Sequence, residues 1–346
     1  MIGLRGVGKT VLLEELRTRS EAGGNITAMI EAPEKKSLPA GLIPELRIAL
    51  MRFSRFEAAK NLTLRGWKAL AGFASSMKLK YNDIEVHVDI EPESGLADTG
   101  DLEHDLAVLL ETIATAAQQA GVALVILIDE LQYVPTSQLG PLVAALHRCV
   151  QRQLPVTFVG AGLPQLRGIL GNAKTYAERL FEFSEVSALI PTAAMDAIRI
   201  PLDAEGVEIA DDALELILAD TQGYPYFLQE WGKHAWNCAP YSPITRDDVE
   251  FARSVAQASL DTSFFGVRFD RISDAERLYM VGMATLGSGP YPTSAVAENL
   301  GKQPQELSTI RSRLINKGMI WSPTYGTVDF TVPLFGAFLL RRVAPR

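Results

Sequence analysis

The chain has 346 residues, of which 47% are hydrophobic and 21% are charged, and its formal net charge is −8 at pH 7. This length exceeds one typical domain, and the composition is that of a globular protein that can bury a substantial core. A net negative charge excludes a polycation that coats nucleic acid with its whole surface, so any such contact must come from a local patch.

Hydrophobic runs and cysteines indicate where the protein works. No apolar run reaches the roughly 18–20 residues that a bilayer requires, and the longest, at 122–128, stops at Asp129. The sequence does not open with a basic region followed by an apolar stretch, so no signal peptide is expected. Cys149 and Cys238 lie far apart and form no C-x-x-C motif, which favours a reducing compartment. We therefore expect a cytoplasmic protein with no membrane partner.

The first feature in chain order is a glycine-rich loop at residues 3–10, GLRGVGKT, which matches the pattern G-x-x-x-x-G-K-[ST]. In such loops, backbone N–H groups converge on nucleotide phosphates, which a Cβ atom would obstruct. The lysine adds a positive charge, the threonine hydroxyl contacts Mg²⁺, and the following helix adds its dipole. The candidate nucleotide-binding residues of this segment are Gly3, Gly6, Val7, Gly8, Lys9, Thr10 and Val11.

A helix is expected directly after the loop, with its end at Gly23-Gly24. Its predicted buried face consists of Val11, Leu12, Leu13 and Leu16. Phosphate loops normally follow a buried strand that aims them, but only Met1 and Ile2 precede this one. We interpret the first strand as truncated, and because the supporting strand is short we expect the loop to bind ATP weakly.

Strands and helices alternate up to about residue 160. The apolar run at 122–128 lacks polar alternation, which is typical of a central parallel strand covered on both faces. Between about residues 33 and 100 the pattern loosens, and we interpret this segment as an insertion. The other predicted elements are strands at 26–30, 84–90 and 156–159 and helices at about 44–55, 102–113 and 141–152. This alternation predicts an α/β fold with a parallel sheet.

Two acidic residues, Asp129 and Glu130, end the most apolar strand. Open α/β sheets bind ligands outside the carboxyl ends of their strands, so we expect this pair to face the nucleotide. Asp129 can hold Mg²⁺ together with Thr10, and Glu130 can polarise an attacking water. The alternative is an exposed strand end with capping carboxylates, but a phosphate loop followed by such a strand favours a nucleotide site.

The C-terminal half is predicted to be mainly helical, with two parts. Helices of the first part are expected at about 210–219, 226–236 and 247–259. Those of the second part are expected at 274–286, 294–300 and 304–316. A hairpin signal at Tyr325-Gly326 follows the last helix. Three helices followed by a hairpin predict a winged helix-turn-helix.

The third helix of this winged helix is a candidate reader of double-stranded DNA. Its outward positions are Ser308, Thr309, Ser312, Arg313 and Lys317. Between residues 273 and 346, Lys and Arg number 8 and Asp and Glu number 5, and this difference of 3 favours phosphate contact. The face has few bidentate side chains, so we expect modest affinity directed at the DNA backbone. A winged helix that contacts protein is the alternative.

Several motifs together give the chain a family resemblance. Residues 3–10 and 124–130 resemble the Walker A and Walker B elements of AAA+ P-loop ATPases. Later motifs resemble the branch that contains origin-recognition-type, archaeal-type and STAND ATPases. These motifs are LPVTFVGAGLP at 154–164, YAERLF at 176–181 and GYPYFLQ at 223–229. The resemblance covers essentially the whole chain, with the poorest fit between about residues 33 and 100.

The resemblance implies a domain order and roles for two more residues. The implied domains are an AAA+ nucleotide-binding domain at 1–191 with its insertion at about 33–100, a helical lid at 192–264 and a winged helix-turn-helix at 265–346. Arg179 takes the place of the arginine that is presented to a neighbouring subunit's γ-phosphate, which implies a homo-oligomer. A surface ion pair with Glu178 or Glu182 is the alternative. Pro225 matches the lid proline of the STAND-like branch, where other members carry a sensor arginine.

These features predict an ATP-binding protein whose ligands are ATP or ADP and Mg²⁺. Two departures from the family pattern, Pro225 and a fourth strand that ends in backbone alone at VGAG (159–162), favour a slow ATPase over a fast motor. We therefore expect an ATP hydrolase that acts as a nucleotide-dependent switch coupled to DNA through the winged helix. The alternative is a non-hydrolysing ATP-binding scaffold whose winged helix contacts protein.

Overall fold

The computed structural model describes residues 1–32, 37–77, 80–81, 84–85 and 90–343. The chain divides into two compact units. The N-terminal unit contains Met1–Ile2 and Lys9–Glu185, and the C-terminal unit contains Gly3–Gly8 and Val186–Arg346. The domain boundaries expected at 191–192 and 264–265 stay predictions.

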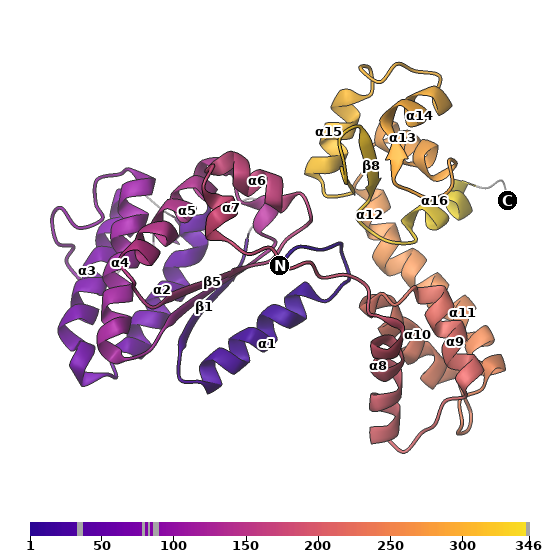
Figure 1. The fold of residues 1–346 in the computed structure, drawn as a ribbon, viewed down its shortest axis with the longest axis horizontal. Coiled ribbons are helices and arrows are strands. Elements are labelled where there is room, and N and C mark those ends of the chain that lie inside the picture. Colours follow the sequence, from indigo (N-terminus) through magenta and orange to yellow (C-terminus); the bar gives the residue numbers. More distant parts are fainter. Residues whose placement is uncertain (33–36, 78–79, 82–83, 86–89, 344–346) are drawn as a thin grey trace. The chain divides into compact units, whose positions relative to one another are not determined.

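A parallel three-stranded sheet forms the centre of the N-terminal unit (Figure 1). Its strands, in spatial order, are β1 (Ile26–Glu31), β4 (Leu124–Asp129) and β5 (Val156–Gly160). Every residue of β4 is buried, as expected for a central strand. Just beyond β5, Ile2 forms single parallel bridges with Gly162 and Glu185. The two residues that precede the glycine loop therefore lie beside the carboxyl end of β5.

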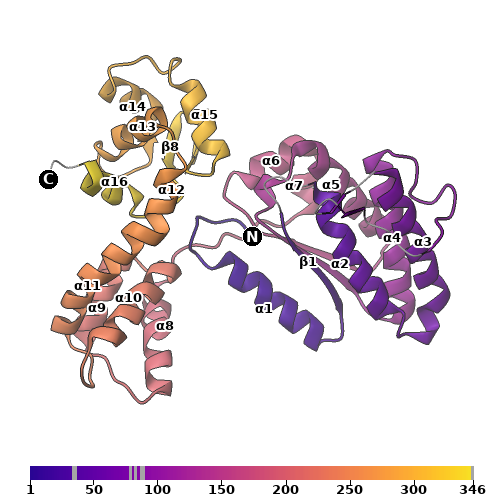
Figure 2. The same ribbon diagram turned by 180° about the vertical axis from the view of Figure 1, so that it is seen from behind.

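Helices cover the two faces of this sheet unequally (Figures 1 and 2). The helices are α1 (Lys9–Ala22), α2 (Leu38–Phe53), η1 (Glu57–Ala59), α3 (Lys60–Ser76), α4 (Leu102–Ala120), η2 (Leu131–Tyr133), α5 (Thr136–Gln151), α6 (Leu166–Ala173) and α7 (Ala177–Leu180). The main core joins one sheet face to α2, α3, α4 and α5. On the other face, Leu13 of α1 packs with Val125 and Leu127 in a smaller core. A separate antiparallel pair consists of β2 (Lys80–Tyr81) and β3 (Ile84–Glu85).

The buried face predicted for α1 is largely wrong. Only Lys9 and Leu13 of this helix are buried, whereas Val11 is 69% exposed and Leu12 and Leu16 are about two-fifths exposed. The reason is the layering within the N-terminal unit, where α1 packs on β1 and β4. Only the side chains that point straight at the sheet are covered there.

The loosely patterned segment before residue 100 contains two long helices. Pro44, where a helix was expected to begin, lies inside α2, whose first turn is capped by Ser37. α3 was not predicted, because its glycines read as loop signals. In the structure these glycines allow close packing: a Cβ on Gly72 would lie 2.6 Å from the backbone oxygen of Leu96.

The C-terminal unit begins with a bundle of four helices, which we call the lid. The lid helices are α8 (Pro191–Ala204), α9 (Asp211–Thr221), α10 (Pro225–Cys238) and α11 (Arg246–Leu260). α11 continues through a π-helix, η3 (Asp261–Gly266), into α12 (Val267–Asp270). A single buried core runs from the lid into the elements that follow.

Those following elements have the order of a winged helix. They are α13 (Asp274–Ala284), β6 (Tyr291–Pro292), α14 (Thr293–Asn299), α15 (Ser308–Asn316), β7 (Ile320–Trp321), β8 (Thr327–Phe330) and α16 (Phe335–Val343). The strands form an antiparallel sheet in the order β6-β8-β7, which confirms the hairpin predicted at Tyr325-Gly326. α15 begins four residues later than predicted from Pro304, because residues 304–307 form turns and Glu306 accepts the N–H of Gln303 at 2.7 Å. Within the described part of the chain, no helix is long and apolar enough to cross a membrane.

A pair of glycine substitutions tests the packing of the unexpected helix. We expect Gly72→Ala to lower the free energy of unfolding by about 1–3 kcal/mol, because the new methyl group would overlap the backbone of Leu96. The matched control is Gly168→Ala in α6, where a Cβ meets nothing within 4 Å. The control is expected to gain up to about 1 kcal/mol from helix propensity. Urea denaturation of both variants measures the difference, and a Gly72→Ala protein as stable as the control would contradict this packing.

Candidate nucleotide-binding site

The end of β4 and the start of α1 meet through one short hydrogen bond. The Thr10 hydroxyl donates to Asp129 Oδ2 at 2.5 Å. The other carboxylate oxygen, Oδ1, accepts the N–H of Glu130 at 2.8 Å. Asp129 is only 4% exposed, and Lys9, at the first position of α1, is 7% exposed. The register of β4 between its two neighbours sets where this carboxylate lies, since Asp129 pairs with Glu31 of β1.

Glu130 occupies an uncommon backbone conformation for a residue other than glycine. Its φ of 51° and ψ of 35° lie in the left-handed region, a conformation that costs free energy and is concentrated at functional sites. Gln132 donates a hydrogen bond from Nε2 to Glu130 Oε2. The amide oxygen of Gln132 accepts the N–H of Leu163 at 3.0 Å. Gln132 therefore fixes the Glu130 carboxylate to the chain just beyond β5.

Gln132 is a site residue that the sequence did not reveal. The strand predicted at 156–159, which is β5, was expected to end without a polar side chain. The residues at the end of β5 carry none. The polar group at this place comes from η2 instead, because the Gln132 amide oxygen reaches Leu163. A Cβ on Gly162 would lie 2.6 Å from that oxygen, so the glycine leaves room for it. A glutamine two positions after Glu130 was the only available signal.

The glycine loop has the backbone that its sequence demands. Gly6 and Gly8 have φ values of 84° and 89°, which side chains with a Cβ rarely adopt. At Gly3, a Cβ would lie 2.1 Å from the backbone oxygen of Val186. Among the described residues, none accepts a hydrogen bond from the N–H of Gly6, Val7 or Gly8. Since Val7 is 4% exposed and buried N–H groups are nearly always paired, these donors fit an anion.

The outer side of the loop contacts the rest of the C-terminal unit. Tyr226 donates its backbone N–H to the oxygen of Gly6 at 3.1 Å. Arg5 donates its N–H to the oxygen of Thr331 at 3.0 Å, and its Nε lies 3.4 Å from the oxygen of Gly318. Pro225 is the first residue of α10, directly before Tyr226. Its ring suits that position because the first N–H of a helix has no partner within the helix.

Arg179 lies on the short helix α7 and is exposed. Within the described ranges, no acidic side chain lies within ion-pairing distance of it, so the expected alternative of pairing with Glu178 or Glu182 is not observed. The exposed guanidinium is available to another molecule. Its proposed role toward a neighbouring subunit stays a prediction.

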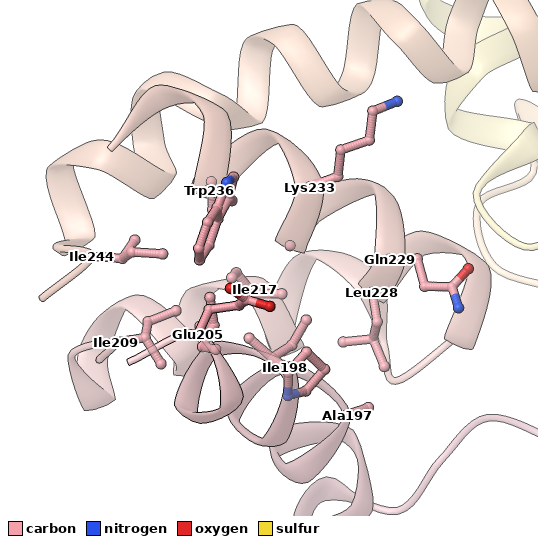
Figure 3. Close-up of a pocket in the computed structure, with 14 residues that line it drawn as sticks. Ala197, Ile198, Glu205, Ile209, Ile217, Leu228, Gln229, Lys233, Trp236 and Ile244 are labelled. Carbon is pink, nitrogen blue, oxygen red and sulfur yellow. The ribbon is translucent and has the colours of Figure 1, made fainter. Parts of the chain in front are cut away.

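The pocket within the lid does not compete as a triphosphate site. It has a volume of about 320 Å³ and lies among α8, α9 and α10 (Figure 3). Its walls are mainly aliphatic, with Trp236 on one side and Glu205 opposite. Its one lysine, Lys233, lies 3.7 Å from Glu230. A triphosphate requires several converging donors and cations, which this lining does not supply.

The residues predicted to contact DNA divide into two groups. Thr309, Ser312 and Arg313 are exposed on α15, and Ser308 is partly buried. Lys317 instead donates to the buried carboxylate of Glu276 at 2.8 Å. Burial favours a raised pKa for Glu276, but hydrogen bonds from Lys317 and Ser273 outweigh it and hold that pKa below its usual value. Lys317 therefore has a structural role within the winged helix.

The site's donors fit Mg²⁺ and a nucleotide. Magnesium binds hard oxygen ligands and takes one or two carboxylates or hydroxyls together with phosphate oxygens. The Thr10 hydroxyl and the Asp129 carboxylate are such a pair, and they already lie in contact. The loop N–H groups described above are the matching donors for phosphate oxygens.

Comparisons with known proteins bear on the family and on the fold. Residues 1–170 match the model of the AAA domain, and residues 262–339 match that of a domain of unknown function (DUF8462). The Walker-type ATPase paby2304 of Pyrococcus abyssi is 15% identical, with a TM-score of 0.61 over 98% of this chain and 89% of its own. The Orc1 protein of Aeropyrum pernix in complex with DNA is 15% identical, with a TM-score of 0.41 over 98% of this chain and 85% of its own. No curated protein matches the chain.

The family model and the archaeal structure bear on different parts of the sequence-based prediction. The match at residues 1–170 contains both the glycine loop and the Asp129-Glu130 pair. The archaeal ATPase shares the fold across nearly the whole length, including the C-terminal helices and their small sheet. The predicted fold class is thereby confirmed. Residues 1–170 are an AAA-type P-loop ATPase domain.

Proposed function

We propose that the protein is a slow Mg²⁺-dependent ATPase that acts as a nucleotide-controlled switch. The observation that carries this proposal is the contact between Thr10 and Asp129, which joins the two motifs at the carboxyl end of β4. The N–H groups of Gly6, Val7 and Gly8, which donate to no residue that the structure describes, support it because they suit phosphate oxygens. Lys9 would contribute a positive charge toward the β- and γ-phosphates.

In this proposal each side chain has a separate task. Thr10 and Asp129 would hold Mg²⁺, which neutralises charge on the phosphates when bound. Glu130 Oε1 or Oε2 would accept a proton from, or orient, the attacking water. Gln132 fixes the direction of that carboxylate. Arg179, exposed on α7, would complete the charge stabilisation only in a neighbouring copy, which agrees with slow turnover by a single chain.

The winged helix supports a modest DNA-binding role. Thr309, Ser312 and Arg313 form the exposed face of α15 and would contact phosphates and groove edges of double-stranded DNA. The pairing of Lys317 inside the unit removes one cation from that face. With one positive charge fewer, the face is less suited to DNA. This favours the second candidate function, in which the winged helix of a non-hydrolysing scaffold contacts a protein.

Glu130→Gln and Lys9→Ala separate hydrolysis from binding. We expect Glu130→Gln to keep Mg-ATP binding and to lose about 100-fold or more in turnover, because general-base groups contribute on this order. Lys9→Ala should lose binding itself. Isothermal titration and phosphate release measure the two properties, with Glu215→Gln, an exposed lid carboxylate, as control. Mg-ATP binding without measurable turnover in the wild type would favour the scaffold, and a turnover that Glu130→Gln leaves unchanged would contradict the role of Glu130.

Gln132→Ala tests the support of the catalytic carboxylate. Removing the amide frees Glu130 from its hydrogen bond, so we expect kcat to fall about 10-fold while KM changes little. Steady-state kinetics across a range of ATP concentrations give both values. A rise in KM of about 10-fold with an unchanged kcat would instead assign Gln132 to nucleotide binding.

Arg313→Ala is expected to change DNA binding, whereas Lys317→Ala is expected to change stability. The first should weaken binding to duplex DNA of arbitrary sequence and reduce the slope of log K against log salt by about 1. The second should lower stability, because the buried carboxylate of Glu276 loses its partner. The folded pKa of Glu276 is depressed, so this stabilisation is present above the ordinary glutamate pKa and is lost as pH falls through the folded pKa.

The stability gap between the wild type and Lys317→Ala should therefore narrow in acid. Thermal denaturation from neutral pH downward measures the gap. A constant gap at every pH, or an unchanged salt slope in Arg313→Ala, would contradict these two assignments.

A further inference from the structure

The glycine loop is packed with the lid and the winged helix, and not only with the strand that precedes it. Residues Gly3–Gly8 group with the C-terminal unit. Backbone hydrogen bonds from two parts of this unit hold the loop there. The lid supplies the N–H of Tyr226 to Gly6, and the winged helix supplies the carbonyl of Thr331 to Arg5. Both partners come from ordered backbone: Tyr226 lies in the first turn of α10, and Thr331 is fully buried.

These contacts use loop groups that phosphates do not require. Gly6 offers its carbonyl to the lid, and a carbonyl cannot donate to a phosphate oxygen. Arg5, whose N–H faces the winged helix, is outside the set of residues predicted to bind nucleotide. The N–H groups of Gly6, Val7 and Gly8 donate to no described residue. The lid and the winged helix can therefore hold the loop while its inner donors remain available.

The winged helix carbonyl is itself held in place. The Thr331 hydroxyl donates to the oxygen of Gly318 at 2.6 Å, and the Thr331 N–H donates to the oxygen of Met319 at 3.1 Å. Gly318 is the same residue whose oxygen lies 3.4 Å from Arg5 Nε. The backbone and the side chain of Arg5 thus contact one rigid corner of the winged helix, at the end of α15 and the end of β8.

A line of aromatic rings continues from the loop contact through the C-terminal unit. The ring of Tyr226 stacks on Phe264 of the π-helix, with centroids 4.5 Å apart and planes at 28°. Phe264 contacts Phe265 edge-on, and Phe265 stacks on Phe338 of α16 at 5.2 Å. π-helical turns are often found at functional positions. Lid, π-helix and winged helix are therefore joined by direct contact to the residue that holds Gly6.

We propose that Arg5 and Tyr226 are positioning residues that fix the shape of the phosphate loop from the winged helix and the lid. The inference rests on the proposed nucleotide site and deepens it by naming what couples that site to the winged helix. A loop preformed by these contacts binds nucleotide more tightly than a loose one, because less ordering is required on binding. Linkage then demands the reciprocal effect: bound nucleotide strengthens the hold of the winged helix on the loop.

Three variants remove the contacts one at a time. Arg5→Ala removes the guanidinium and keeps the backbone N–H, whereas Arg5→Pro removes the N–H that faces Thr331. Tyr226→Ala removes the ring that stacks on Phe264. We expect Arg5→Pro and Tyr226→Ala to weaken Mg-ATP binding about 5- to 50-fold, within the usual range of coupling between sites. Arg5→Ala should have a smaller effect, since its bond to Gly318 is long.

Hydrogen exchange provides a readout that a purely structural role would not change. In the wild type, Mg-ATP should slow amide exchange in residues 318–334, and this ATP-dependent protection should disappear in Arg5→Pro. Matched controls are Arg19→Ala and Tyr241→Ala, whose side chains are exposed away from these contacts. The controls should keep both the affinity and the protection. If Arg5→Pro fails to fold, Arg5→Ala and Tyr226→Ala carry the test.

The results separate a failure of the positioning role from a failure of the proposed function. Wild-type affinity in Arg5→Pro and Tyr226→Ala, or weakened affinity with undiminished protection of residues 318–334, overturns the positioning role. If the wild type binds no Mg-ATP, the proposed function fails. The exchange of residues 318–334 without nucleotide then still decides this inference: faster exchange in Arg5→Pro supports the contact, and unchanged exchange refutes it.

Discussion

The hydrogen bond from Thr10 to Asp129 is the contact on which the proposed chemistry depends. It requires that α1 begin where β4 ends, and this is set by the sheet. β4 pairs in parallel with β1 and β5 along its length, so its carboxyl end has one position relative to both neighbours. A slip of one residue would turn the Asp129 side chain to the opposite face of the sheet. Because every residue of β4 is buried, such a slip would also disturb the close packing on both faces of the sheet, and the register is strongly fixed.

The glycine loop is held both by the residues that precede it and by contacts on its outer side. Before the loop, Ile2 forms β-bridges with Gly162 and Glu185, and the Met1 amino group donates to the oxygen of Gly160 at 2.7 Å. The loop itself gains support on its outer side, through backbone hydrogen bonds to Gly6 and from Arg5. The position of the loop is therefore fixed by the bridges of Ile2 and by the backbone hydrogen bonds on the loop's outer side.

Sequence patterns predicted those parts of the fold that depend on local signals. The buried run at 122–128, the glycine loop and the hairpin at Tyr325-Gly326 each have a signature within a few residues, and the structure contains all three. α3 could not be read in this way, since Gly66 and Gly72 act through tertiary packing. The exposure of Val11 was missed for the same reason, because periodicity shows which side chains share a helix face but not how many layers cover it. Gln132 joins Glu130 to Leu163, which lies thirty-one positions further along the chain, and a contact over that separation has no local sequence signal.

A count of charges from the sequence also misses tertiary contacts, because it does not show which basic side chains of the winged helix are paired with acids. Seven of the 8 basic residues between 273 and 346 lie in the part of the chain that the structure describes, and three of these seven are paired with acids inside the C-terminal unit. Arg277 contacts Asp274, Lys317 contacts Glu276, and Arg341 contacts Asp261. Charges neutralised by a neighbour release few counterions from DNA, so the local excess overstates the electrostatic footprint. What remains outward on α15 is chiefly Arg313 among small hydroxyl side chains. A surface with one arginine among hydroxyl side chains favours weak contact with the DNA backbone over the recognition of a defined DNA sequence.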